Sequence, residues 1–243
     1  MFTHLANVRA LCEQLGLYNI ASGLIPLYDI PEDILEKLEI ILRQEVCFKD
    51  ERRYKILRGR SHLPEIKTFE DFDNKFQPVM TDTLIAKIKH LTWVEEKFNI
   101  LMLGGAGTGK THIATAIGHY AIRNGMKVFY ATVKELLYFI KTQNTIGKSR
   151  TRLGYIHGCE LLIVDEFGYE PITKEDALAI YNLINNVNRT ASVILATNRS
   201  FDLWPELFGD VVLANTLLDR LIEKCQVLDL GEDSYRVAIH QTI

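Results

Sequence analysis

The sequence has little cysteine and no long apolar run, and both absences narrow the class of protein. Its four cysteines lie far apart and form no Cys-x-x-Cys pair, so neither a disulfide framework nor a zinc site of that kind is indicated. No stretch reaches the roughly 18 consecutive apolar residues of a membrane-spanning helix. Arg9 and Glu13 interrupt any apolar run near the start that could serve as a secretory signal. We therefore expect a cytoplasmic protein with no membrane partner.

Positive charge is concentrated in two segments, although the net charge of the chain is only −3. The segment Arg43–Arg60 holds seven basic and three acidic residues, and the segment Lys141–Arg152 holds four basic residues and no acidic one. Such basic islands attract phosphate groups. A solvated helix face in the first segment and a flexible loop in the second would explain the same composition, so DNA contact is a hypothesis at this point.

Two different apolar patterns divide the chain. Before about residue 75 the spacing is helical, as in the run from Ile34 to Leu42 that follows a helix start at Pro31. The stretch Thr68–Pro78 is not periodic and contains several aromatic residues, which we expect to pack the junction onto the core. We predict a helical N-terminal domain at residues 1–75 and a second domain at residues 76–243.

The second domain alternates short apolar runs with amphipathic segments, the pattern of a parallel sheet built from β-α units. The predicted strands are Asn99–Leu103, Lys127–Ala131, Leu161–Val164, Val193–Ala196 and, more weakly, Gln226–Leu230. The predicted helices are His112–Arg123, Val133–Thr142, Lys174–Val187 and Leu213–Lys224. The fold class is therefore α/β.

The segment Gly104–Thr111 matches the phosphate-loop (Walker A) pattern G-x-x-x-x-G-K-[ST] between a predicted strand and a predicted helix. Its glycines let successive backbone N–H groups turn toward phosphates, and the start of the helix adds a positive dipole end. Lys110 would reach the β and γ phosphates, and the Thr111 hydroxyl would coordinate Mg²⁺. A glycine turn with a purely structural role is the alternative. The ATP-binding residues predicted from this pattern are Gly104, Gly105, Ala106, Gly107, Thr108, Gly109, Lys110 and Thr111, and the family resemblance given below adds His112.

Two further strands end in polar residues. Asp165 and Glu166 follow the apolar run Leu161–Val164 as a Walker B element does, so Asp165 would hold the magnesium and Glu166 would polarise the attacking water. Asn198 follows the run Val193–Ala196, where its amide could bridge the γ phosphate and that water, or could simply occupy a turn.

Two arginines near the end of the sequence remain ambiguous on spacing alone. Arg220 projects away from the leucine face of its predicted helix and could pair with Glu223 or act on the ATP of a neighbouring subunit. For Arg236, spacing alone does not decide between a role on the surface and a role at the nucleotide site.

Together these residues resemble the AAA+ ATPases and, within them, the IstB family of ATP-dependent helpers of insertion-sequence transposition, relatives of the bacterial helicase loader DnaC. The resemblance covers nearly the whole chain. It departs at Gly104–Gly107, where the family usually has Gly-Pro-Pro-Gly, and at Glu166, where it usually has a second aspartate. Beyond the Walker motifs it rests on Thr68–Asp73, Phe76–Pro78, Gly109–His112, Asp165–Tyr169, Asn198–Phe201, Phe208–Asp210, Leu218–Leu221 and Ser234–Arg236.

The resemblance implies an AAA+ P-loop core, with a parallel sheet flanked by helices and little or no C-terminal lid, after a small all-helical domain. It implies a bacterial ATPase that uses ATP and Mg²⁺, with Asn198 as sensor 1, Arg220 as an arginine finger given in trans and Arg236 as a residue like sensor 2. It also implies assembly of a homo-oligomer on duplex DNA and recruitment of the transposase of the same element. We assign the DNA contacts to Lys49, Arg52, Arg53, Lys148, Arg150 and Arg152.

Two other functions remain open. A helicase loader related to DnaC would use the same ATPase core, although Phe208–Ala214 and the Arg43–Arg60 segment look more like the transposition branch. A metabolic P-loop kinase would need a pocket for an acceptor substrate that the sequence does not reveal.

Overall fold

The computed structural model of the chain describes residues 3–72 and 76–235. It divides into two compact units, Met1–Ile56 and Leu57–Ile243. The boundary expected at residue 75 thus falls inside the second unit. The first residues of the second unit pack against the rest of that unit. The His62 ring stacks on Phe129 with centroids 5.8 Å apart, and the buried Phe69 ring lies edge-to-face with Tyr120. These contacts explain why the compact core begins earlier than the sequence pattern suggests.

The first unit is helical, with α1 (Thr3–Leu15), α2 (Tyr18–Ala21) and the longer α3 (Glu32–Arg60), which continues into the second unit. Helix α3 starts directly after Pro31, as the sequence predicts. Of its expected apolar face, Leu35 and Leu42 are buried, whereas Ile34 and Ile41 are 49% and 61% exposed. The small core is made by Val8, Leu11, Cys12, Leu27, Leu35 and Leu42.

The second unit is built on a parallel five-stranded sheet with the order β2-β3-β4-β1-β5. The sequence predicted all five strands to within a few residues, and the α/β AAA+ architecture is confirmed. The strands are β1 (Asn99–Leu103), β2 (Val128–Thr132), β3 (Leu161–Phe167), β4 (Ser192–Thr197) and β5 (Cys225–Asp229).

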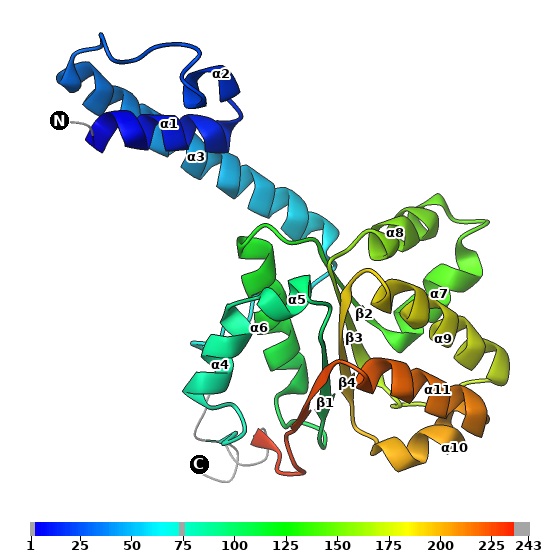
Figure 1. Cartoon of the computed structure of the whole chain (residues 1–243). Coiled ribbons are helices and arrows are strands. Elements are labelled where there is room, and N and C mark those ends of the chain that lie inside the picture. The colour runs from blue at the N-terminus through cyan, green and yellow to red at the C-terminus, as the bar shows by residue number, and fades with distance from the viewer. Residues whose placement is uncertain (1–2, 73–75, 236–243) are drawn as a thin grey trace. The chain divides into compact units, whose positions relative to one another are not determined.

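Helices cover both faces of this sheet (Figure 1). On one side lie α4 (Asp82–Lys89), α5 (Thr92–Glu95) and α6 (Lys110–Arg123). On the other lie α7 (Val133–Thr142), α8 (Gly147–His157), α9 (Lys174–Asn188), α10 (Trp204–Phe208) and α11 (Val211–Ile222), with the short 3-10 helix η1 (Phe201–Leu203) before α10.

Helix α8 corrects one expectation. The basic segment Lys141–Arg152, for which a flexible loop was one interpretation, contains the first half of this helix, and Ser149, Leu153 and Ile156 are buried on its inner side. The apolar positions are too few and too widely separated by charged residues to give a clear helical period. Packing against the rest of the second unit therefore determines that this segment is helical.

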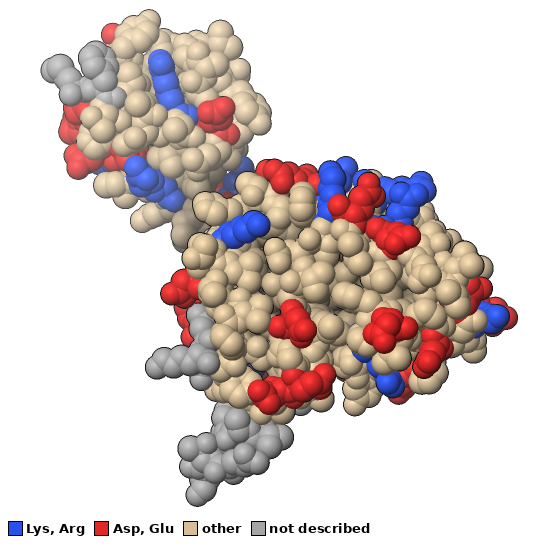
Figure 2. Space-filling view, turned by 60° about the horizontal axis from the view of Figure 1, so that its bottom comes forward, with Lys and Arg blue, Asp and Glu red and all other residues tan. Residues whose placement is uncertain are grey.

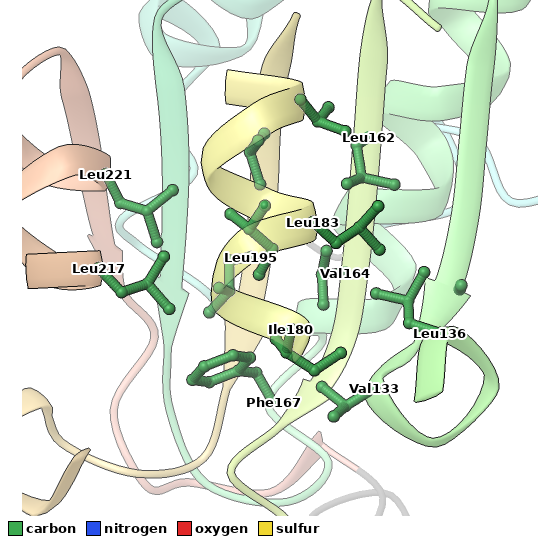
Figure 3. Packing of buried hydrophobic residues seen from close by; sticks show 14 of the residues in the cluster. Val133, Leu136, Leu162, Val164, Phe167, Ile180, Leu183, Leu195, Leu217 and Leu221 are labelled. Atoms are coloured by element: carbon green, nitrogen blue, oxygen red, sulfur yellow. The ribbon is translucent and has the colours of Figure 1, made fainter. Parts of the chain in front are cut away.

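The main hydrophobic core lies between the sheet and the α7, α9 and α11 face (Figure 3). Side chains alternate between the two faces of each strand, so Leu162 and Val164 of β3 point to this core together with Leu195 of β4. Ile180 and Leu183 of α9 pack over them. Fully burying such side chains contributes about 1.5–3 kcal/mol each, which fixes the strand order and hence the positions of the strand ends.

The α6 face is more closely packed at one point. A Cβ atom at Gly118 would lie 2.9 Å from Ile163 Cδ1 of β3 and 2.9 Å from a methyl group of Leu63. Glycine at this position lets α6 approach the sheet, so the helix that starts at the phosphate loop is held directly against the strand that carries Asp165.

Candidate nucleotide site

The phosphate loop joins the end of β1 to the start of α6. Gly107 and Gly109 have φ angles of 83° and 101°, in the left-handed region that favours glycine. Gly109 is the N-terminal cap of α6, which begins at Lys110 and runs for 14 residues. The free backbone N–H groups and the positive dipole end of a helix therefore face the end of β1, an arrangement suited to phosphate.

Lys110 keeps its ammonium group over this loop. Its Nζ donates hydrogen bonds to the carbonyl oxygens of Gly104 and Gly105, both at 2.6 Å. Burial lowers the pKa of the Lys110 ammonium, whereas the carboxylates of Asp165 and Glu232 act in the opposite direction. The loop thus carries a partly desolvated cation whose partners are backbone oxygens, and an anionic ligand would interact with it strongly.

Thr111 and Asp165 meet beside the loop. The Thr111 hydroxyl donates to Asp165 Oδ2 at 2.7 Å, and the Glu166 backbone N–H donates to Asp165 Oδ1 at 2.8 Å. Asp165 is only 3% exposed. The pair presents hydroxyl and carboxylate oxygen atoms, which are the ligand types that Mg²⁺ takes.

The small number of protein ligands also fits magnesium. Mg²⁺ sites that serve nucleotides use one or two protein ligands together with phosphate oxygens and water, not a cage of protein side chains. Thr111 and Asp165 therefore match a nucleotide-linked magnesium site.

Glu166 has an unusual backbone. Its φ angle is 56°, and the pairing of β3 with β4 shifts register between Val164 and Phe167. Such a conformation costs about 1–3 kcal/mol at a residue other than glycine and persists where the surrounding structure enforces it. At this irregularity Glu166 is exposed, whereas its neighbour Asp165 is buried. Although its side chain reaches solvent, partial desolvation by the surrounding protein atoms and the charge of Asp165 raise the pKa of the Glu166 carboxyl above its usual range, as suits a proton acceptor.

Asn198 directly follows β4, the strand that lies between β3 and β1 in the sheet. Because the carboxyl ends of parallel strands meet at one edge, Asn198 lies between the Asp165 strand and the phosphate-loop strand. Its Oδ1 is buried and has no hydrogen-bond partner in the described part of the chain. Buried polar atoms are rarely left without a partner, so the Asn198 side chain is a candidate for contact with a bound ligand.

A pocket of about 390 Å³ adjoins the loop, and sequence reasoning did not predict it. The buried Gln77 side chain lines this pocket and donates hydrogen bonds to the carbonyl oxygens of Thr108 and Leu230. The junction aromatics were expected only to pack onto the core, as Phe69 does, but others line this pocket. Its aromatic and imidazole lining is Phe72, Phe76, His112 and Tyr235.

His112 and the segment before residue 236 also frame the loop. The His112 ring lies 2.9 Å from the Thr68 carbonyl oxygen and meets Phe72 edge-on. The Gly105 N–H donates to Gly231 O, and the Tyr235 N–H donates to Gly107 O. No local pattern in the sequence indicates these main-chain contacts between the phosphate loop and residues so far along the chain. Arg236, predicted to resemble a sensor 2 arginine, lies outside the described residues.

Arg220 is exposed near the end of α11, whereas Leu217 and Leu221 of the same helix are buried. The side chain therefore projects away from the leucine face, as expected. In the described part of the chain, its guanidinium forms no hydrogen bond or ion pair, so the alternative pairing with Glu223 is not seen. Its role at a neighbouring subunit remains a prediction.

The residues assigned to DNA lie on α3 and α8. Lys49 donates to the Gln14 carbonyl, and Arg52 and Arg53 are exposed. Lys148 and Arg150 are exposed on α8, but the Arg152 guanidinium is half-buried and lies 4.8 Å from the centroid of the Phe139 ring.

Surface charge is mixed on the face of the Leu57–Ile243 unit that Figure 2 shows. Basic side chains gather near one edge among acidic ones, and acidic side chains are spread over the rest of that face. This face is therefore not a continuous basic surface, and the DNA contacts remain predictions.

A phosphate loop after the interior strand β1, carboxylates at the end of β3 and a polar residue after β4 define a P-loop ATP-binding domain of the AAA+ class. The model of the IstB-like ATP binding protein family matches residues 29–242. The chain belongs to this IstB-like family and is an ATP-binding AAA+ protein. In the described part of the chain, no helix is long and apolar enough to span a membrane.

Two relatives show the similarity over most of the chain. An ATP-binding protein of insertion sequence IS21 from Pseudomonas aeruginosa is 35% identical over 205 residues, which cover 83% of this chain and 76% of that protein. An ATP-binding protein of insertion sequence IS5376 from Geobacillus stearothermophilus is 34% identical, with coverage of 81% and 78%. Among solved structures, AMPPCP-bound DnaA from Aquifex aeolicus shares the fold, with a TM-score of 0.54, 20% identity and coverage of 70% of this chain and 51% of that one.

Proposed function

We propose that this protein is a magnesium-dependent ATPase that assembles on duplex DNA and recruits and stimulates the transposase of its own insertion sequence. The observation that carries the ATPase part is the arrangement of Thr111, Asp165, Glu166 and Asn198 at one edge of the sheet, beside the Lys110 loop. The names of the relatives, which are ATP-binding proteins of insertion sequences, support the role in transposition.

The chain's own residues divide the work of binding. The loop N–H groups and Lys110 would hold the phosphates, and the aromatic pocket beside the loop has the size and lining for a planar base. Thr111 and Asp165 would hold Mg²⁺, which when bound neutralises phosphate charge. Asp165 stays oriented because both of its oxygen atoms accept hydrogen bonds.

Glu166 and Asn198 have the features needed for hydrolysis. The Glu166 carboxylate would accept a proton from the attacking water, and its raised pKa brings its basicity closer to neutral pH. The unpartnered Asn198 Oδ1 would orient that water from the adjacent strand end. Hydrolysis to ADP and phosphate would then need only a group that stabilises charge on the far side of the phosphate.

Arg220 is the candidate for that group. Its exposed guanidinium lies on the outer side of α11, so it would act on a site in a second copy of the chain and make the active form a homo-oligomer. Arg236 is proposed as a further phosphate-sensing arginine on the basis of the sequence motif alone.

Duplex DNA is the proposed platform for assembly. The exposed residues Arg52, Arg53, Lys148 and Arg150 could contact backbone phosphates without reading sequence. A helicase loader would use the same ATPase core, but the relatives named above belong to insertion sequences, which favours transposition.

The experiment that tests this function reconstitutes the protein with duplex DNA, ATP, Mg²⁺ and the transposase encoded beside it. We expect ATP-dependent assembly on DNA and stimulation of strand transfer by the transposase. The matched control is Glu166→Gln, which should bind ATP without turnover. Assembly that ignores both ATP and DNA, or a transposase equally active without this protein, would contradict the proposal.

A further inference from the structure

Tyr130 lies on β2, which is one of the two edge strands of the described sheet, and none of the roles described above uses it. It is 9% exposed, and its hydroxyl donates a hydrogen bond to Asp165 Oδ2 at 2.8 Å. We propose that Tyr130 is a positioning residue for Asp165: its hydroxyl fixes the carboxylate in the orientation in which Asp165 and Thr111 can together hold Mg²⁺. This inference rests on the proposed magnesium-dependent nucleotide site.

The hydrogen bonds to Asp165 show why the tyrosine matters. Asp165 Oδ1 accepts the Glu166 N–H, and Oδ2 accepts both the Thr111 and the Tyr130 hydroxyl groups. Without Tyr130, the Oδ2 end would keep only Thr111, whose hydroxyl oxygen must itself serve the metal. A ligand carboxylate is typically oriented by such outer hydrogen bonds, and their loss weakens metal binding.

The register between β2 and β3 fixes the position of the Tyr130 hydroxyl. Tyr130 pairs with Ile163 in the parallel register of β2 and β3. Because side chains alternate along a strand, Ile163 and Asp165 point to the same face, and Tyr130 reaches Asp165 diagonally across the pair. The hydroxyl therefore comes from a strand, which is a more rigid support than a loop.

The outer side of the edge strand is also held. The Tyr130 N–H donates to the Ser61 carbonyl at 2.8 Å, and His62 Nδ1 lies 3.2 Å from the Tyr130 carbonyl oxygen. Ser61 is fully buried. The main chain of Tyr130 is thus bonded to residues 61–62 on the outer side, its strand pairs with β3 on the other side, and its hydroxyl bonds to Asp165.

A purely structural tyrosine would behave differently. If the hydroxyl only satisfied a buried acceptor, its removal would change the free energy of unfolding and leave metal binding as it was. If it positions Asp165, its removal changes the metal concentration that nucleotide binding requires. The two roles therefore separate in a metal titration.

The test compares Tyr130→Phe with a matched control, Tyr155→Phe. The phenylalanine at position 130 keeps the ring and removes only the hydroxyl. Tyr155 also has a buried hydroxyl oxygen, but within the described residues that atom has no hydrogen-bond partner. For each variant, binding of a fluorescent non-hydrolysable ATP analogue is measured at increasing Mg²⁺ concentration. Direct binding of Mn²⁺ in the presence of the analogue is followed by electron paramagnetic resonance.

We expect Tyr130→Phe to raise the metal concentration at half-saturation roughly 10- to 100-fold, the range found when outer hydrogen bonds to metal ligands are removed. Binding of the analogue in EDTA should be unchanged. Tyr155→Phe should titrate like the wild type.

Two results would overturn the proposal, and a third concerns the function on which it rests. A wild-type metal midpoint in Tyr130→Phe would reject the positioning role, even if its melting temperature fell. An equal shift in Tyr155→Phe would reject it as well, because the shift would then follow from any lost buried hydroxyl. If wild type and Asp165→Asn bound the analogue identically with and without metal, the proposed magnesium site itself would fail.

Discussion

The nucleotide edge of the sheet and the exposed basic residues of α3 and α8 carry their charges in opposite ways. At the nucleotide edge Lys110 and Asp165 have fixed hydrogen-bond partners at 2.6–2.8 Å. On α3 and α8, Arg52, Lys148 and Arg150 are exposed to solvent. A charge held by several partners acts through geometry, whereas an exposed charge acts through long-range attraction that salt screens.

This contrast predicts which substitutions should have the largest effects. Removing a fixed group at the nucleotide edge leaves partners unsatisfied and disturbs one chemical step, so large, specific effects are expected. Removing one exposed cation changes a sum of similar contributions, so each effect should be modest and dependent on salt.

Lys110→Ala should abolish nucleotide binding, whereas Glu166→Gln should keep it and stop turnover. The lysine supplies the cation of the phosphate loop, and the glutamate acts only when a proton must be accepted. Equilibrium binding of a labelled ATP analogue and release of phosphate, measured on both variants, separate the two roles. An equal loss of ATP affinity in both would show that Glu166 belongs to binding.

Arg220→Ala should bind ATP nearly normally and lose hydrolysis by roughly 10³-fold or more, the scale of fingers supplied in trans. Mixed assemblies of Arg220→Ala with Lys110→Ala on DNA should recover part of the activity, because each subunit lacks what the other provides. Phosphate release by the separate and mixed variants measures this. Full activity of Arg220→Ala alone would return the arginine to a surface role.

Reversing charge at Arg52 and Arg53 together should weaken duplex binding by about tenfold or more at low salt and make it less sensitive to salt. Each phosphate contact that is lost lowers the slope of log affinity against log salt by about 0.9. Fluorescence anisotropy of labelled duplexes of two unrelated sequences, at several salt concentrations, gives affinity, slope and sequence dependence. Unchanged binding would remove α3 from the DNA surface.

Arg152→Ala should lower the free energy of unfolding by about 0.5–1 kcal/mol, the contribution of a partly exposed cation–π contact. Its guanidinium lies over Phe139, whereas Lys148 on the same helix is exposed and provides the matched control. Urea unfolding of Arg152→Ala and Lys148→Ala measures the difference. Equal stability of the two variants, with equal losses of DNA affinity, would place Arg152 among the exposed cations instead.

Local sequence determined the elements that follow from short-range rules. The glycines and Lys110 specify a phosphate loop because their spacing imposes a turn into a helix. The apolar runs specify five strands because strands buried on both faces need continuous apolar residues. The AAA+ fold was therefore predictable from these motifs, and family membership from them together with further segments such as Phe208–Asp210 and Leu218–Leu221.

Tertiary structure decided what depends on residues far apart in the chain. Tyr130 reaches Asp165 across 35 positions, and Tyr235 bonds to Gly107. Neither pair leaves a local pattern. The chain order of the strands differs from their order in the sheet, so only packing shows that β4 lies between β3 and β1 and brings Asn198 between the two Walker motifs. The sequence determined which chemical groups are present, and burial of the core on both faces of the sheet determined which of them meet.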